Sequence, residues 1–456
     1  MHGYTVKEQP LGTLRPVRVI IIGAGVSGIN LARTLNQQTE EGASEWVLQV
    51  KNEATGAIFE DRCNFLCDAT GIFNDWKWPD IKGLHSFKGD LIHTAKWPKD
   101  FDHRSKRVAV IGNGASGVQI VPVLQPEVKK LVHFIRTKTW ISPTSKAVEH
   151  VHQYELDSAN QFTAKQVQEF RLAPEKYLAF GSPEAEEARQ TISRYMDAAL
   201  HHNSELIAAL KPDFPVGSRR ITPGVGYLDA LLQPNTRVVS TGIEEITADG
   251  IKLTSGEFIE VDAIVCATGF NCSFVPRFPM IGEYGNLQDR WRDSPPEAYM
   301  SCMVPGMPNY FTYLGPNGPL AHGAIPLISE RLTLYLLQFL HKCQTSHITS
   351  FRPLPAAVHD YNTHIQAFMP RTVWADTNVR SWYCAGKADG PVLALHPGSP
   401  AHFFHMLEKP RWEDFEWRVS GGNRFAYLGN GFSTREGEER GEKDSTWYMG
   451  EPEGFL

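Results

Sequence analysis

Two glycine-rich turns of the pattern G-x-G-x-x-G constrain the fold more than any other feature of this chain. Each follows a run of β-branched residues, at 18–22 and 107–111, and precedes a stretch compatible with a helix. The glycines are Gly23, Gly25 and Gly28 in the first turn and Gly112, Gly114 and Gly117 in the second. In such a strand–turn–helix, the glycines permit a tight turn, close approach of backbone to a pyrophosphate, and close helix–strand packing. The sequence therefore predicts an α/β fold with two Rossmann-like units that each bind a dinucleotide.

A segment between the two turns carries five residues at fixed spacing. They are Phe87, Gly89, His93, Trp97 and Pro98. This pattern, F-x-G-x-x-x-H-x-x-x-W-P, resembles the fingerprint of Baeyer–Villiger monooxygenases, a branch of the class B flavoprotein monooxygenases. The resemblance implies one domain for FAD, one for NADPH, and a fingerprint that acts as a hinge between steps of the reaction. On that basis His93 is a hinge and hydrogen-bonding residue rather than a general base.

Further stretches are similar to the same family, from about residue 17 to about residue 405. Two Ala-Thr-Gly turns, at 69–71 and 267–269, look like the places where the chain crosses between the FAD and NADPH domains. Asn317 lies in a Gly-Pro-Asn-Gly-Pro stretch that resembles the one before a helix whose N-terminus faces the flavin ring. Residues 374–399 resemble the carboxy-terminal part of fungal members, which implies a role in a secondary-metabolite pathway.

Three arginines are the candidate charged groups. Arg136, followed by Thr137, lies about twenty residues after the second glycine turn, where a Rossmann unit contacts the adenosine ribose. A cation there favours NADPH, because it pairs with the 2′-phosphate. The resemblance assigns Arg219 to the NADPH phosphate and Arg220 to the flavin face, where its charge would stabilise the anion formed during oxygenation. The residues alone leave open that these arginines are surface charges.

The predicted organisation alternates between the two domains. We expect an FAD-binding domain at 1–100 and 266–418, an NADP-binding domain at 101–265 with a helical insertion at about 150–210, and a disordered tail at 419–456. Within the insertion, residues 189–200 form a candidate helix. Residues 46–67 are interpreted as a meander of three short antiparallel strands.

The segment after the first glycine turn departs from the family pattern. No apolar strand comes after residues 29–35. Glu40, Glu41 and Glu45 lie at about the distance in sequence from Gly23 that a ribose-binding acid has, but no strand places them beside the ribose. The family's Gly-Gly-Thr-Trp turn under the flavin also has no equivalent. The chain is therefore an incomplete gene product, a member that has lost oxygenation, or one in which another segment, such as that of Trp76 and Trp78, replaces the missing one.

Composition excludes several other classes of protein. A net charge of −6 without basic runs argues against a nucleic-acid partner. No apolar run reaches the ~20 residues of a spanning helix and the N-terminus lacks a signal-peptide core, so we expect a cytoplasmic protein. The seven scattered cysteines predict no metal site.

The sequence as a whole predicts an FAD- and NADPH-dependent monooxygenase that inserts one oxygen atom from O2 into an organic ketone. Two alternatives stay open. One is an N- or S-oxygenating flavin monooxygenase, which shares the two glycine turns. The other is a non-catalytic NADP(H)-binding protein, which the missing flavin-side segment favours.

Overall fold

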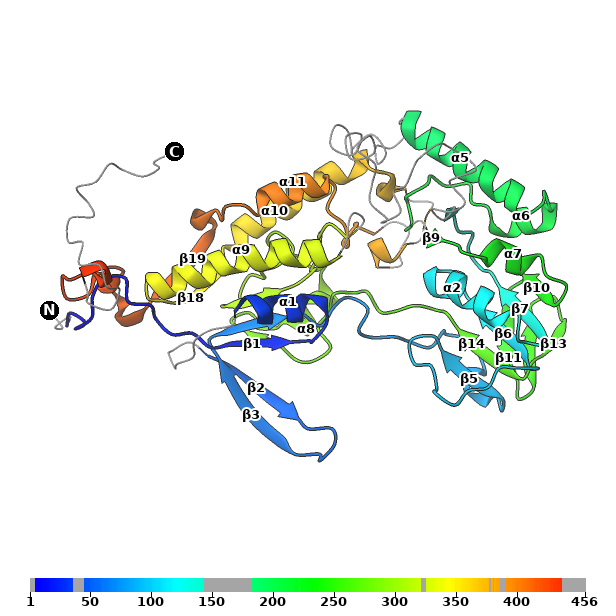
Figure 1. The fold of residues 1–456 in the computed structure, drawn as a ribbon, viewed down its shortest axis with the longest axis horizontal. Coiled ribbons are helices and arrows are strands. Elements are labelled where there is room, and N and C mark those ends of the chain that lie inside the picture. The colour runs from blue at the N-terminus through cyan, green and yellow to red at the C-terminus, as the bar shows by residue number, and fades with distance from the viewer. Residues whose placement is uncertain are drawn as a thin grey trace. The chain divides into compact units, whose positions relative to one another are not determined.

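Each glycine turn lies at the carboxyl end of a parallel strand, in a sheet of its own. The computed structural model describes residues 5–35, 45–142, 183–220, 222–320, 325–376, 379, 381–385 and 390–436. The chain divides into unit 1, comprising Met1–Ile72, Phe274–Ile365 and Ala394–Leu456, and unit 2, comprising Phe73–Ser273 and Gln366–Leu393 (Figure 1). The predicted α/β fold with two Rossmann-like units is confirmed.

Unit 1 is built on a three-stranded parallel sheet. Its strands are β1 (Val19–Ile22), β4 (Phe65–Asp68) and β17 (Tyr310–Thr312), in the order β1-β4-β17. Helix α1 (Val26–Thr34) leaves the first glycine turn and lies beside the long helix α9 (Ile325–Thr345), as Figure 1 shows. A buried hydrogen bond of 2.7 Å between the hydroxyls of Ser27 and Ser329 joins these two helices.

The remaining elements of unit 1 are antiparallel strand pairs, helices and short turns. They are β2 (Trp46–Lys51), β3 (Ile58–Cys63), β15 (Ile281–Gly282), β16 (Gly285–Asn286), α8 (Leu287–Asp293), β18 (Ile348–Pro353), α10 (Pro355–Phe368), α11 (Pro400–Met406), η6 (Trp412–Asp414), β19 (Phe415–Val419), η7 (Ser420–Gly422), η8 (Ala426–Leu428) and η9 (Thr434–Glu436). The last three residues of α10 belong to unit 2. The pairs β2–β3 and β18–β19 are antiparallel, and β2–β3 extends away from the rest of unit 1 in Figure 1.

The predicted three-stranded meander at 46–67 is wrong in its third member. Strand β3 ends at Cys63, and the next residues form β4, which pairs in parallel with β1 and β17. Asn64 makes the break, because its side-chain oxygen accepts a hydrogen bond from the Arg18 backbone N–H at 2.8 Å. Residues 65–67 are buried on both faces, which is typical of a central parallel strand rather than of a hairpin.

Unit 2 is built on a five-stranded parallel sheet with the order β10-β7-β6-β14-β5. The strands are β5 (Asp90–His93), β6 (Arg107–Ile111), β7 (Lys130–Phe134), β10 (Thr236–Val239) and β14 (Ala263–Cys266). The second glycine turn follows β6. The next strand of this sheet along the chain, β7, lies on one side of β6, and the later strand β14 lies on the other side. That position is a topological switch point, where open α/β sheets bind their ligands at the carboxyl ends of the strands.

Helices and a second, antiparallel sheet surround the central sheet of unit 2. These elements are η1 (Leu84–Ser86), α2 (Ala115–Leu124), β8 (Ile141–Ser142), α5 (Pro183–Ala199), α6 (Ser204–Leu210), β9 (Thr222–Pro223), α7 (Tyr227–Leu231), β11 (Ile243–Ile246), β12 (Gly250–Leu253), β13 (Phe258–Glu260), η3 (Met369–Arg371), η4 (Val373–Ala375) and η5 (Trp382–Cys384). Helix α5 confirms the helix predicted at 189–200. Much of the predicted insertion, residues 143–182, lies outside the described residues.

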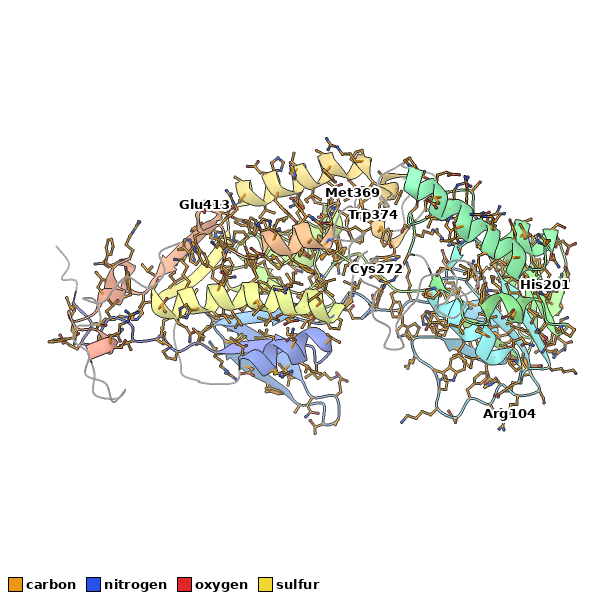
Figure 2. The ribbon with its side chains drawn as sticks, turned by 45° about the horizontal axis from the view of Figure 1, so that its top comes forward. Arg104, His201, Cys272, Met369, Trp374 and Glu413 are labelled. Carbon is orange, nitrogen blue, oxygen red and sulfur yellow. The ribbon has the colours of Figure 1, made fainter. Side chains whose placement is uncertain are left out.

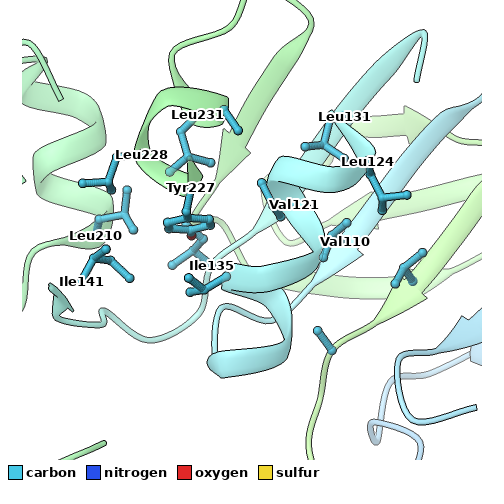
Figure 3. Close-up of a cluster of buried hydrophobic side chains, with 14 of the residues drawn as sticks. Val110, Val121, Leu124, Leu131, Ile135, Ile141, Leu210, Tyr227, Leu228 and Leu231 are labelled. Carbon is cyan, nitrogen blue, oxygen red and sulfur yellow. The ribbon is translucent and has the colours of Figure 1, made fainter. Parts of the chain in front are cut away.

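A continuous apolar core holds α2 and α7 against the strands of unit 2. Val121 and Leu124 on α2 face Val110 and Leu131 on the strands, and Tyr227, the first residue of α7, belongs to the same buried cluster (Figure 3). Burial of this many aliphatic side chains stabilises the sheet at ~25 cal/mol per Å² of apolar surface. The core therefore gives the second glycine turn a rigid support.

The division into units differs from the expected domain limits in more than one stretch. Residues 366–393, expected with the FAD-binding domain, belong to unit 2. The stretch 73–100, expected with the FAD-binding domain, belongs to unit 2, because β5 pairs in parallel with β14. At the other end, residues 420–436 of the expected disordered tail form short turns, and Asn430 N–H donates to the Gln9 carbonyl at 3.0 Å. The rest of that tail, 437–456, lies outside the described residues.

Candidate nucleotide-binding sites

The two glycine turns repeat one geometry, each within its own unit. The first glycine of each turn has a positive φ, +113° at Gly23 and +105° at Gly112. A Cβ at Gly23 would overlap the Ala69 carbonyl, and one at Gly112 would overlap the Ala267 carbonyl. Each glycine turn thus packs on the Ala-Thr-Gly turn at the end of the neighbouring strand. The two Ala-Thr-Gly turns therefore have a structural role in supporting the glycine turns.

The second and third glycines of each turn differ in what surrounds them. A Cβ at Gly28 or Gly117 would overlap the carbonyl of the first glycine of its own turn, so these two positions serve packing. A Cβ at Gly25 or Gly114 would meet nothing within 4 Å. Both are N-cap residues of their helices, α1 and α2, and neither supplies a side-chain cap. Uncapped helix N–H groups facing open space suit the pyrophosphate of a dinucleotide.

Asn113, in the second turn, is a site residue that the glycine pattern did not reveal. Its side chain is buried and donates a hydrogen bond of 3.2 Å to the Thr139 hydroxyl. This bond ties the glycine turn to the loop after β7. The sequence signal was weak, because any residue fits the variable position between the first two glycines.

Arg136 and Arg219 come together beside this loop. Arg136 is exposed two residues after the end of β7, with the half-buried Thr137 next to it. Burial and, secondarily, the charge of Arg136 lower the pKa of the Arg219 guanidinium. The Arg219 guanidinium also lies over the Phe214 ring, at 5.8 Å from its centroid. A guanidinium whose charge is disfavoured by burial and by a neighbouring cation gains from a bound anion such as a phosphate.

Arg220 is exposed and lies near a buried tyrosine. Burial raises the pKa of Tyr383 to about 12, and the positive charge of Arg220 acts in the opposite direction. Tyr383 belongs to η5, in the stretch of unit 2 formed by Gln366–Leu393. The structure therefore places both arginines of the pair at 219–220 in unit 2, where the charge of Arg219 interacts with Arg136 and that of Arg220 with Tyr383.

Phe87 and Gly89 of the fingerprint precede β5, His93 is the last residue of β5, and Trp97 and Pro98 follow it. His93 is paired with Cys266 across β5 and β14, and a Cβ at Gly89 would overlap the Asp262 carbonyl and the Phe87 ring. The fingerprint therefore runs alongside the strand that leads into the second Ala-Thr-Gly turn. Trp97 packs edge-on against Phe101 at 5.5 Å. Pro98 is exposed, and its carbonyl accepts the Phe101 N–H at 3.5 Å.

His93 is buried in an aromatic cluster. The Trp76 ring stacks on it at 4.7 Å, and Trp78 meets it edge-on at 5.8 Å. The Ala95 N–H donates to Nδ1 of His93 at 3.1 Å, and burial lowers the pKa of the ring. A neutral, hydrogen-bonded histidine suits a structural role better than proton transfer. Trp76 and Trp78 thus pack on the fingerprint in unit 2, whereas the first glycine turn lies in unit 1.

Asn317 is fixed in a strained loop of unit 1. It is 1% exposed, has a φ of +58°, and donates from Nδ2 to the Leu395 carbonyl at 3.0 Å. Leu314 in the same loop also has a positive φ, of +57°. Ser301 braces the loop, because its hydroxyl donates to the Gly315 carbonyl at 2.8 Å. Such strain persists only where the surroundings fix it, and it is common at ligand sites.

The acid expected for the first glycine turn is not among the described residues beside β1. Within these residues β1 pairs with β4 alone, and Glu45 forms an ion pair with Arg62 at 3.2 Å. Glu40 and Glu41 lie outside the described residues. Among the residues that the structure covers, no group of three or more His, Cys, Asp or Glu side chains is arranged to hold a metal ion. None of the described helices has the length and apolar character needed to cross a bilayer.

Two strand–glycine turn–helix cradles with open second glycines define a protein of the two-dinucleotide-binding class. No family model matches the chain. It is 36% identical over 438 residues to an FAD-binding monooxygenase, tazF, from Aspergillus terreus, covering 91% of this chain and 76% of that protein. It is 35% identical over 350 residues to a Baeyer-Villiger monooxygenase from Streptomyces coelicolor, covering 74% of this chain and 65% of that one.

The fold also matches that of a solved enzyme. Cyclohexanone monooxygenase from Rhodococcus sp. Phi1, bound to NADP+, superposes with a TM-score of 0.67 at 23% identity, covering 82% of this chain and 78% of that one. The chain belongs to the class B flavoprotein monooxygenases of Baeyer–Villiger type, as its fingerprint predicts. Members of this family are FAD-dependent monooxygenases.

Proposed function

We propose that this chain uses FAD and NADPH to insert one oxygen atom from O2 into an organic ketone, giving an ester or lactone. The observation that carries the proposal is the duplicated cradle, in which Gly25 and Gly114 both border open space in front of an uncapped helix. The similarity of the chain to an Aspergillus enzyme, and of residues 374–399 to the carboxy-terminal part of fungal members, supports a ketone of secondary metabolism as the substrate.

The described residues fit both nucleotides at their pyrophosphates. The N-termini of α1 and α2 offer backbone N–H groups and the positive end of a helix dipole to a diphosphate. In unit 2, Arg136 and Arg219 bind the 2′-phosphate, which NADPH carries and NADH lacks. The first cradle therefore takes FAD, and the second takes NADPH.

When bound, NADPH supplies a hydride and FAD supplies the chemistry that activates dioxygen. The chain's own residues bind, orient and stabilise charge. Arg136 and Arg219 anchor the phosphate end of the nucleotide, and the loop around Asn317 holds backbone groups rigidly in unit 1. Arg220 carries a positive charge in a position open to solvent and ligands, where it would stabilise negative charge that develops on a reacting oxygen.

The test is oxidation of NADPH by the FAD-loaded chain in the presence of cyclic and polyketide-like ketones, with detection of ester products. We expect Arg220→Ala to lower product formation roughly a hundredfold while NADPH binding stays unchanged, because a charge that acts on the transition state is removed. The control is Arg237→Ala, an exposed arginine of unit 2 that pairs with Glu257. Product formation by Arg220→Ala at the wild-type rate would contradict this role.

A non-catalytic NADP(H)-binding protein is the second candidate, and one observation favours it. Within the described residues β1 has a neighbouring strand on one side only, whereas β6 has one on each side. The two candidates differ in the absorbance spectrum of the purified chain after FAD is added. A flavin spectrum that bleaches with NADPH supports the oxygenase, and retention of NADP+ without flavin supports the second candidate.

A further inference from the structure

The loop at 214–220, here called the arginine loop, is held by two buried tryptophans that donate to two of its carbonyls. Trp140 Nε1 donates to the Phe214 carbonyl at 2.9 Å, and Trp374 Nε1 donates to the Gly217 carbonyl at 3.1 Å. The two indoles are 3% and 4% exposed and come from parts of unit 2 far apart in sequence. Trp374, labelled in Figure 2, belongs to η4.

The carbonyl that Trp374 holds belongs to a turn that only glycine accommodates well. Gly217 has a φ of +94°, and the Ser218 N–H donates to the Pro215 carbonyl at 3.4 Å, as in a β-turn with a left-handed third residue. The fully buried Val373 contacts the open side of Gly217, at 3.4 Å from the place where a Cβ would lie. The neighbouring residues Val373 and Trp374 therefore both contact Gly217, two residues before Arg219.

These contacts oppose an unfavourable interaction between the charges of Arg219, in the arginine loop, and Arg136. Arg219 is partly buried, and both that burial and the charge of Arg136 disfavour its ionised form. The two indole hydrogen bonds hold the loop on the protein and keep the pair of guanidiniums in place for a phosphate.

The segment that carries Trp374 also reaches Arg220. It closes on itself, because the Leu393 N–H donates to the Tyr383 carbonyl at 2.8 Å and Gln366 Nε2 donates to the Val392 carbonyl at 3.0 Å. Tyr383 in turn feels the charge of Arg220. Trp374 therefore contacts the arginine loop at Gly217, and Tyr383, from the same part of unit 2, feels the charge of Arg220.

We propose that Trp374 is a positioning residue that fixes the arginine loop through the Gly217 carbonyl and thereby sets the affinity for the NADPH phosphate. This inference rests on the proposed function, since it takes Arg219 as a nucleotide-binding residue. It assigns Trp374 no contact with the reacting atoms.

The variant Trp374→Phe tests the inference, because it keeps an aromatic ring and removes only the N–H donor and part of the ring. The control is Trp417→Phe in unit 1, whose Nε1 donates to the Trp412 carbonyl at the same 3.1 Å. NADP+ binding to each full-length protein is measured by calorimetry, and thermal unfolding is recorded alongside. We expect NADP+ to bind roughly fivefold more weakly to Trp374→Phe and normally to Trp417→Phe. In turnover, the KM for NADPH should rise while kcat changes little.

A double-mutant cycle separates positioning from general destabilisation. Trp374→Phe in an Arg219→Ala background should cost no further NADP+ affinity, because the loop then has no Arg219 to position. A further loss of the same size in that background would overturn the inference, and so would wild-type affinity in Trp374→Phe. If Trp374→Phe does not fold, Trp140→Phe enters the same cycle, because it removes the other indole bond of the loop.

The cycle also distinguishes this inference from the proposed function. If Arg219→Ala alone leaves NADP+ affinity unchanged, the assignment of Arg219 is wrong and the positioning role falls with it. If Arg219→Ala weakens NADP+ binding while Trp374→Phe does not, only the role of Trp374 is wrong.

Discussion

Glycine is required for different physical reasons at neighbouring positions of one turn. Gly117 lies where a Cβ would overlap the Gly112 carbonyl, so only glycine is accommodated there. Gly114 instead borders open space, and its φ of −70° is one that any residue adopts. Nothing within the described protein therefore requires glycine at 114. A ligand that needs the space does, and this distinction between packing and binding glycines is the residue-scale signature of a nucleotide site.

We expect Gly114→Ala to weaken NADP+ binding roughly tenfold or more while changing the free energy of unfolding by less than ~1 kcal/mol, because the new methyl group occupies the pyrophosphate space only. Gly117→Ala should instead lower the free energy of unfolding by ~1–3 kcal/mol through overpacking. Calorimetric binding of NADP+ and urea unfolding of both variants check this. Equal loss of stability in the two variants would contradict the distinction.

The sequence predicted the residues of these turns but missed those that support them. Glycine spacing is local, so Gly112, Gly114 and Gly117 could be read directly. Asn113, Trp140 and Trp374 act through contacts with residues distant in the chain, and no spacing rule encodes such contacts. The roles of Arg219 and Arg220 came from a family resemblance. The structure adds that the charge of Arg136 acts on Arg219 and that the charge of Arg220 acts on Tyr383.

At the scale of elements, the pairing partner of a strand was harder to predict than its existence. Strand β4 was expected as the third strand of a meander, yet its continuous burial places it in the parallel sheet with β1. The helix α5 was predicted because its apolar spacing is local. Long-range pairing depends on which surfaces remain to be buried, which one strand's sequence does not state.

Strand β7 carries a buried histidine that makes the stability of unit 2 depend on pH. Burial lowers the pKa of His133 to about 4. The Tyr227 hydroxyl donates to its Nε2 at 2.9 Å, and Nδ1 faces the Val110 carbonyl at 3.3 Å. Its neutral form is thus favoured in the folded protein, whereas in the unfolded chain His133 takes up a proton below about pH 6.5. Stability is therefore lost as the pH falls from about 6.5 toward 4.

We expect this one group to lower the free energy of unfolding by up to ~3 kcal/mol between pH 7 and pH 4. His133→Gln should be less stable at pH 7 but lose less on acidification, whereas Tyr227→Phe should keep the wild-type pH dependence, because burial is the larger cause of the shift. Urea unfolding at a series of pH values, monitored by tryptophan fluorescence, measures both slopes. A wild-type slope in His133→Gln would rule out this account.

The whole molecule repeats one ligand-binding design in two units that differ in how much sheet supports it. The cradle of unit 2 lies in the middle of five parallel strands, and that of unit 1 lies at the edge of three. A rigid support preorganises a site and so raises its affinity, because less order must be gained on binding. Within the described residues, the second cradle is thus the better supported of the two.

The difference in support predicts that the chain binds NADP+ and FAD with separable energetics. Gly25→Ala should abolish flavin retention, because a methyl group at Gly25 fills space in front of α1, while NADP+ affinity stays within about twofold, because unit 2 holds its own cradle. The converse variant, Gly114→Ala, should keep the flavin and lose NADP+. Flavin absorbance after gel filtration and calorimetric titration with NADP+ measure the two sites on the same protein. A loss of NADP+ affinity in Gly25→Ala as large as that in Gly114→Ala would mean that the second site needs the first to be filled. Wild-type flavin retention in Gly25→Ala would instead mean that FAD does not enter the first cradle at this glycine.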